Sequence, residues 1–437
     1  GSFEAEKLLT GAREAASQPW TGADGSHGAP QPIYWNNFTS PGGVGESTLD
    51  SSVAFHGSAS MKIESHGPAG TSVGVTNRGL GNEGLVFEAG KEYEGYLFVK
   101  SDTATTLRVA LRNYVSAETL ASARLNHPGG GKWQRLNFSV VPNASTSCRE
   151  MRSTDTSVHC TPPKPGTADK PAVSRDHICL LCGGEVLIGL DAPTGLGLAA
   201  AVVHVDFVFV QPGAWGRFQG LPVLASTVTA LQKIGVSAIR QGGSFTDPSY
   251  YFWKRWRGPA WARPSMSATW GSSYEGGWGP FEMLDLCEAA GIEPVITTTA
   301  QSAASHASPG LPALPACCAP EDMADLLEYC WGNSSTTWGQ QRIKDGHAAP
   351  YKLRYIELGN EQYNSLFIDQ VKAMEARAAA IGKPSFFNYI FPSNLGLNAT
   401  DIARAKNAGL DASRLLADLH VGYGGAVEQA QAEFKKK

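Results

Sequence analysis

The feature that most constrains the fold is a change of sequence rhythm near residue 220. Before it, short alternating or β-branched and aromatic segments are separated by Gly, Asn, Pro and Ser clusters, with no helical period. This pattern is typical of antiparallel sheets and predicts a jelly-roll-like β-sandwich over residues 1–212. The predicted strands are 58–65, 91–101, 106–114, 132–141 and 202–212.

After residue 220, predicted helices and strands alternate. Val223, Val228, Leu231 and Ile234 mark one helix, and further helices begin at Pro280 and near Met323. Each is followed by a strand, and alternating units of this kind predict a parallel sheet, most simply a partial (β/α)8 TIM barrel over 213–437. The five expected strands lie in "VSAIRQGG", "EPVITTTA", "LRYIELGNE", "SFFNYIFPSN" and "LLADLHVGYG".

A polar segment rich in Pro, Thr and Ser, residues 146–176, is expected to form a loop insertion in the sandwich. Four of the eight cysteines lie in or near it, and four lie later in the chain. A zinc site would need a second close cysteine pair, so disulfides are favoured over zinc, with free thiols as the other alternative and the connectivity open. No metal or cofactor is expected. The cysteines are Cys148, Cys160, Cys179, Cys182, Cys287, Cys317, Cys318 and Cys330.

The composition excludes several classes of protein. Hydrophobic residues make up 42% and charged residues 17% of the 437, which indicates a folded chain and not a disordered one. A net charge of −4 gives no reason to expect a nucleic acid or an anionic membrane as partner. The longest apolar stretch, 196–210, is too short to span a bilayer and contains His204 and Asp206.

Glycosylation sequons favour a secreted or extracellular glycoprotein. An Asn-x-Ser/Thr sequence occurs five times, which is more often than expected by chance. The same chain has eight cysteines. The candidate acceptor residues are Asn37, Asn137, Asn143, Asn333 and Asn398.

The predicted strand of "LRYIELGNEQYN" ends in Gly359-Asn360-Glu361. In a (β/α) barrel the catalytic groups lie at the carboxyl ends of the strands, where Glu361 falls. An Asn can hold a substrate hydroxyl while a neighbouring acid protonates a leaving oxygen. Alternatively, Glu361 only stabilises the start of the following helix.

A segment from Trp253 to Trp278 contains five tryptophans and three arginines without a helical or strand period. Exposed aromatic faces stack on sugars, and arginines and amides bond their hydroxyls, so the segment favours a sugar site. Alternatively, it packs under the barrel rim, with some of its tryptophans in the core. The tryptophans are Trp253, Trp256, Trp261, Trp270 and Trp278.

Three blocks carry a resemblance to a known family: "GPFEMLDLCEAAGIEPVITTTA", "DLLEYCWGNSSTTWGQQRIKDGHAAPYKLRYIELGNEQY" and "DLHVGYGG". They resemble consecutive blocks of the α-L-arabinofuranosidases of glycoside hydrolase family 51, and the first half resembles the carbohydrate-binding-module-like sandwich of plant-type members. The resemblance implies a retaining hydrolase that acts on terminal α-L-arabinofuranosyl residues of cell-wall or extracellular-matrix polysaccharides and glycoproteins. An arabinose-containing glycan is thus the expected partner.

The resemblance also implies roles for single residues. It assigns the general acid/base to Glu361 and contact with the sugar's 2-hydroxyl to Asn360. His420 and Tyr423 of "HVGY" match a motif that lines the sugar pocket. Arg240 of "IRQGG" matches an arginine before a glycine pair, although the intervening residues are shortened to one glutamine.

A retaining mechanism needs a second carboxylate about 5–5.5 Å from the acid/base. The family places this nucleophile one strand after the His-x-Tyr strand, and the chain ends before such a strand. Asp418 is a weak substitute, whereas Glu428 and Glu433 are expected to be solvated. The first and last barrel strands are also missing, so further sequence or a second polypeptide is expected to complete the barrel, and residues 1–437 alone are expected to be inactive. The alternative function is a catalytically degenerate carbohydrate-binding or structural extracellular glycoprotein.

Overall fold

The computed structural model divides into two compact units, Gly1–Pro222 and Val223–Lys437, each with its own hydrophobic core. The division lies near the boundary set from the sequence at residue 212. Within these units the structure describes residues 35–57, 59–79, 84–151, 179–193, 200–243, 246, 252–263, 266–267, 273–274, 277–299, 318–361, 364–383, 387–392 and 399–418.

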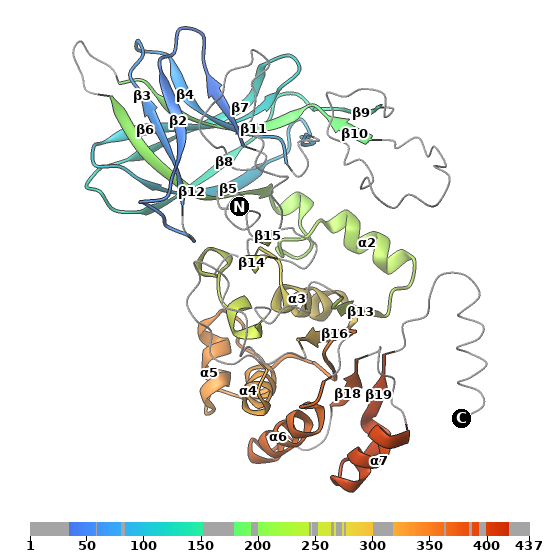
Figure 1. Cartoon of the computed structure of the whole chain (residues 1–437). Coiled ribbons are helices and arrows are strands. Elements are labelled where there is room, and N and C mark those ends of the chain that lie inside the picture. Colours follow the sequence, from blue (N-terminus) through green and yellow to red (C-terminus); the bar gives the residue numbers. More distant parts are fainter. Residues whose placement is uncertain are drawn as a thin grey trace, which may run out of the picture. The chain divides into compact units, whose positions relative to one another are not determined.

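The first unit contains two five-stranded antiparallel sheets (Figure 1). One has the order β1 (Trp35–Thr39), β4 (Ser72–Asn77), β11 (Gly184–Asp191), β6 (Thr105–Asn113) and β7 (Glu118–His127). The other has the order β2 (Gly45–Asp50), β3 (Ser60–Ser65), β12 (Ala201–Pro212), β5 (Tyr93–Lys100) and β8 (Gln134–Val140). The predicted β-sandwich is confirmed, and so are its five predicted strands.

The sandwich core follows from alternation along each strand. On β6, Leu107, Val109 and Leu111 are fully buried, while Arg108 between them faces away from the core. Val203 and Val205 of β12 supply the facing side chains from the other sheet. Because successive strand residues point to opposite faces, the same strands that build the core also present polar residues outward.

The predicted insertion contains structure of its own. Strand β9 (Cys148–Met151) pairs antiparallel with β10 (Cys179–Cys182), and a Cys148–Cys182 disulfide joins them. The disulfide prediction is therefore confirmed for this pair, and Cys318 is disulfide-bonded as well. Among the described residues, Cys287 and Cys330 are buried free thiols, and no cluster suited to a metal ion occurs.

The second unit is built on a five-stranded parallel sheet, as predicted. Its strand order is β13 (Ala238–Gln241), β16 (Glu293–Thr298), β17 (Tyr355–Leu358), β18 (Asn388–Phe391) and β19 (Leu415–Ala417). The helices are α2 (Ala225–Lys233), α3 (Pro280–Ala290), α4 (Pro320–Trp331), α5 (Thr337–Lys344), α6 (Phe367–Ala380) and α7 (Ala399–Asn407). Its shorter elements are η4 (Trp253–Trp256), η5 (Ala260–Ala262), η7 (Ala412–Arg414), β14 (Met266–Ser267) and β15 (Ser273–Tyr274), while η2 (Ala214–Gly216) belongs to the first unit.

Proline and glycine set the limits of the helices in the second unit. Pro280 and Pro320 occupy first-turn positions, where their missing N–H groups cost nothing. Helix α3 ends at Gly291, whose φ of 70° lies in the left-handed region that glycine adopts easily. Helix α4 buries Leu326 and Leu327 in the core of the unit.

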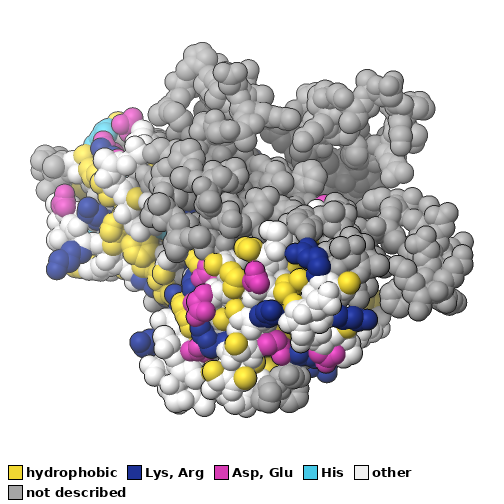
Figure 2. Space-filling view, turned by 60° about the horizontal axis from the view of Figure 1, so that its bottom comes forward, with side chains coloured by type: hydrophobic (Ala, Val, Ile, Leu, Met, Phe, Trp, Pro, Cys, Tyr) yellow, Lys and Arg dark blue, Asp and Glu magenta, His cyan; other side chains and the backbone are white. Residues whose placement is uncertain are grey.

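Helices α4 and α6 are neighbours in the second unit (Figure 1). Arg377 of α6 donates to Asp325 and Glu328 of α4. On the face shown in Figure 2, the described acidic and basic side chains are interspersed instead of gathered by sign. No helix in the described part of the chain is long and apolar enough to cross a membrane.

Candidate functional site

The candidate site lies where β17 ends, in the middle of the parallel sheet. The chain turns at Gly359, with a φ of 121°, a backbone conformation that a side chain would strain. Asn360 is 1% exposed, whereas Glu361 is exposed and has a φ of 43°. A non-glycine residue in the left-handed region is uncommon and costs about 1 kcal/mol or more, so the strain marks Glu361 for functional interest.

Arg240 of β13 fixes the turn; β16 lies between β13 and β17 in the sheet. Its Nε and Nη2 atoms donate to Oε2 and Oε1 of Glu357 at 2.6 and 3.0 Å. The same Nη2 donates to Oδ1 of Asn360 at 2.9 Å. The planar guanidinium thus holds a carboxylate and an amide together, which orients the Asn360 side chain beside Glu361.

Glu357 is fully buried, so it anchors the site instead of contacting a ligand. The Thr297 hydroxyl of β16 donates to its Oε2. Burial raises the pKa of Glu357; hydrogen bonds from Arg240 and Thr297 act to lower it, and a hydrogen bond with Asp418 acts to raise it. The buried carboxyl therefore links β13, β16 and β17 at their carboxyl ends.

Asp418 follows β19 and joins the same cluster. Its Oδ2 lies 3.7 Å from Nη2 of Arg240, and 21% of its side chain is exposed. Burial acts to lower the pKa of Arg240, but the hydrogen bond and charge of Glu357, with the charges of Asp418 and Glu361, raise it overall. Arg240 therefore remains charged, with 33% of its side chain exposed among three carboxylates.

The tryptophan segment divides between core and surface. Trp253 and Trp256 are each 2% exposed in the core of the unit, so their rings have no open face for a sugar. Gly279 packs on Trp256 so closely that an added Cβ would lie 2.2 Å from the indole ring. Trp278 is 37% exposed, while Trp270 lies outside the described residues.

The structure brings Arg240, Asn360 and Glu361 together at the carboxyl ends of the strands. His420 and Tyr423 lie outside the described residues. Sequence reasoning did not single out Glu357 and Thr297. A signal for Glu357 was present, because an acid in the otherwise apolar strand "YIEL" of a parallel sheet needs a buried partner.

Comparison with known proteins finds several α-L-arabinofuranosidases among the relatives. The family model of the α-L-arabinofuranosidase 1 domain matches residues 230–391. An extracellular exo-α-L-arabinofuranosidase of Streptomyces chartreusis is 25% identical over 327 residues, which cover 71% of this chain and 34% of that protein. An intracellular exo-α-L-arabinofuranosidase of Bacteroides ovatus is 30% identical over 137 residues, 31% of this chain and 23% of that protein.

A solved structure shows the same fold. An arabinose-bound α-L-arabinofuranosidase of glycoside hydrolase family 51 superposes with a TM-score of 0.59 at 19% identity, over 82% of this chain and 52% of that one. The chain spans about a third of the length of the Streptomyces relative and about a quarter of the Bacteroides relative. In sequence and fold it is thus similar to the α-L-arabinofuranosidases of this family.

Proposed function

We propose that this chain, which is similar to α-L-arabinofuranosidases of glycoside hydrolase family 51, carries the acid/base side of a retaining glycosidase site. Its substrate would be a glycan with terminal α-L-arabinofuranosyl residues, in cell-wall or matrix polysaccharides or glycoproteins. The arrangement of Glu361 beside an Asn360 amide held by Arg240 is the observation that carries the proposal.

In the proposed reaction, Glu361 protonates the glycosidic oxygen as the bond to the leaving group breaks. Asn360 bonds the 2-hydroxyl of the sugar, an interaction that strengthens in the transition state. Arg240 and Glu357 position Asn360. A second carboxylate must act as nucleophile, and we assign it to none of the described residues.

The test replaces Glu361 with Ala in the longest naturally expressed form of the protein. For substrates with poor leaving groups, we expect the rate of hydrolysis to fall by about 10²–10⁴-fold, the usual contribution of a positioned acid. Added azide should restore turnover of aryl arabinofuranosides that have good leaving groups, because these need no protonation. The matched control is Glu118→Ala, which removes an exposed glutamate from β7. Near-normal activity of Glu361→Ala would show that another group is the acid.

We also propose that the protein is secreted and glycosylated. The side chains of Asn37, Asn137, Asn143 and Asn333 are exposed, as an acceptor must be, whereas Asn398 lies outside the described residues. Peptide N-glycosidase treatment of protein from its natural source should lower its mass and convert occupied sites to Asp. If mass spectrometry finds all five sequons unmodified, the proposal that the protein is glycosylated is refuted.

Finally, we propose that further polypeptide, from the same or a second chain, covers the edges of the parallel sheet. The edge strand β13 is exposed or half-buried along its length, and on the adjoining α2 only Val228 is buried. A parallel sheet is stable in water when both faces and both edges are covered.

A further inference from the structure

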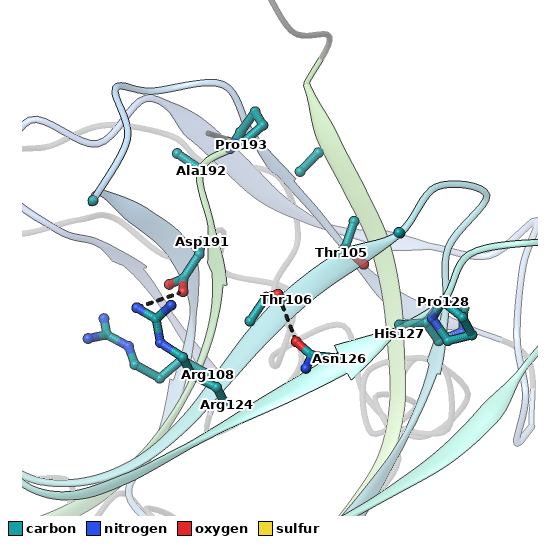
Figure 3. Close-up of a pocket in the computed structure, with 13 residues that line it drawn as sticks. Thr105, Thr106, Arg108, Arg124, Asn126, His127, Pro128, Asp191, Ala192 and Pro193 are labelled. Atoms are coloured by element: carbon teal, nitrogen blue, oxygen red, sulfur yellow. Dashed lines mark hydrogen bonds and ion pairs between the residues drawn. The ribbon is translucent and has the colours of Figure 1, made fainter. Parts of the chain in front are cut away.

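The sandwich contains a pocket that the proposed glycosidase site does not use. Its volume is about 620 Å³, within the range of small-molecule sites (Figure 3). The described lining residues come from β6, β7, the end of β11, the first residue of β12 and the turns beside them. All of them belong to the described part of the first unit.

Two arginines are paired on adjacent strands of the sheet that contains β6 and β7. Arg108 of β6 stands directly opposite Arg124 of β7, and on the other side of Arg108 the paired residue of β11 is Gly189. Like charges directly opposite on adjacent strands destabilise a sheet. Since glycine offers no side chain there, the positive charge needs a compensating group from elsewhere.

One acidic residue supplies part of that compensation. The Oδ2 atom of Asp191 lies 3.5 Å from Nη2 of Arg124, as drawn in Figure 3. Among the described residues, Arg108 donates to the neutral Ser72 hydroxyl alone, at 3.0 Å. The His127 ring bonds two backbone groups, the carbonyl of Lys132 and the N–H of Gly129. The lining residues therefore have one positive charge in excess.

Three buried polar atoms of the pocket have no hydrogen-bond partner among the described residues. They are Nε of Arg108, Oγ1 of Thr105 and Oδ2 of Asp191; the last atom is ion-paired with Arg124 but makes no hydrogen bond. Nε is a donor, Oγ1 can donate or accept, and Oδ2 is an acceptor. Buried polar atoms are normally hydrogen-bonded, so three that lack a hydrogen bond in one pocket indicate a place for a polar ligand.

We propose that this pocket binds a sugar acid, a polyhydroxylated ring that carries one carboxylate, such as a uronate unit of an acidic polysaccharide. The carboxylate takes the excess positive charge of Arg108 and Arg124 through charge-assisted hydrogen bonds. Ring hydroxyls pair with Thr105, Asp191 and the Asn126 amide, whose oxygen accepts from Thr106 at 2.9 Å. The described lining residues include no Phe, Tyr or Trp, so in this part of the pocket recognition relies on charge and hydrogen bonds instead of ring stacking.

The test measures binding of tri-galacturonate to the 437-residue chain by calorimetry, beside a neutral arabino-oligosaccharide and inorganic sulfate. We expect tri-galacturonate to bind, and to bind more weakly as salt rises. Arg108→Ala and Arg124→Ala should each weaken binding by about tenfold or more, as expected for a lost charged hydrogen bond. Arg124 is largely exposed, so its loss leaves the fold intact. Arg135→Ala, on β8 of the other sheet, is the matched control.

The outcomes separate this proposal from the glycosidase proposal. Glu361→Ala should bind tri-galacturonate normally, because the pocket contains no part of the β17 turn. Equal affinity for the neutral oligosaccharide would overturn the choice of an acidic sugar. Displacement by millimolar sulfate would reduce the pocket to a general anion site. Binding that survives both arginine substitutions, or no binding at all, would refute the proposal.

Discussion

At the scale of single residues, a charge is stabilised in this protein by the hydrogen bonds that surround it. Asp50, at the end of β2, accepts from the backbone N–H and hydroxyl of Ser52 at 2.8 and 2.6 Å. His204 of β12 lies 2.9 Å away through its Nε2. These contacts, led by the Ser52 hydroxyl, lower the pKa of Asp50 from 3.8 to about 2.

This lowered pKa predicts an acid-dependent contribution to stability. The folded-state pKa lies below the unfolded one, so ionised Asp50 stabilises the fold above about pH 4, and the contribution disappears as the pH falls towards 2. Asp50→Asn should therefore lower the free energy of unfolding by about 1–2 kcal/mol at pH 7 and by almost nothing near pH 2. Urea unfolding at a series of pH values checks this, with the exposed Asp102→Asn as control. An equal loss at both pH values would contradict the prediction.

The same scale shows what the sequence could and could not reveal about the site. Asn360 and Glu361 were identifiable because a polar pair after an apolar run marks a strand end. The acid in "YIEL" signalled a buried partner for Glu357, but the network that it forms with Arg240, Thr297 and Asp418 could not be derived, since it depends on which strands become neighbours in space. Trp253 and Trp256 read equally well as binding or core residues, and only packing places them in the core.

At the scale of elements, strands with strong apolar alternation were predictable, and polar ones were not. In strand β12, "AVVHVDFVFVQP", the alternation of apolar residues indicates which face is buried. Strands β1, "WNNFT", and β2, "GESTLD", lie at sheet edges with mostly polar residues, so no period marks them. Strand β9 lies in the segment 146–176, whose composition indicates a loop, and β10 follows shortly after it; the two strands are held together by pairing and a disulfide.

We expect the Cys148–Cys182 disulfide of the β9–β10 ribbon to contribute measurably to the stability of the sandwich. Cys148 and Cys182 are 34 residues apart, and closing a loop of that length restricts the unfolded chain by about 3–4 kcal/mol in the chain-entropy model. The double variant Cys148→Ser, Cys182→Ser should lower the free energy of unfolding of the sandwich by about 2–4 kcal/mol. Denaturant unfolding monitored on the sandwich tests this. Dithiothreitol should destabilise the sandwich of the natural chain but not that of the double variant, whose remaining described disulfide cysteine, Cys318, lies in the second unit. Equal stability of the two sandwiches without dithiothreitol would contradict the expectation.

At the scale of the whole molecule, the protection of the parallel sheet decreases from its centre to its edges. Ile356 and Leu358 of the central β17 are fully buried, whereas Leu416 of the edge strand β19 is 38% exposed. Beside the other edge strand, Leu224 and Ile234, which flank α2, are 48% and 75% exposed. These three exposed apolar side chains agree with the proposal that further polypeptide covers the edges of the sheet.

This gradient predicts how hydrogen exchange differs between two forms of the protein. In the 437-residue chain, amides of 225–241 should exchange much faster than those of 355–358, because exposed elements open at low free-energy cost. In the longest natural form, or with a partner chain bound, amides of 225–241 should become protected. Ile234→Asp should abolish that protection, since a carboxylate cannot be covered by an apolar surface, whereas Lys233→Asp at the neighbouring exposed position should retain it. Equal exchange of 225–241 in both forms would show that this edge of the sheet is left uncovered.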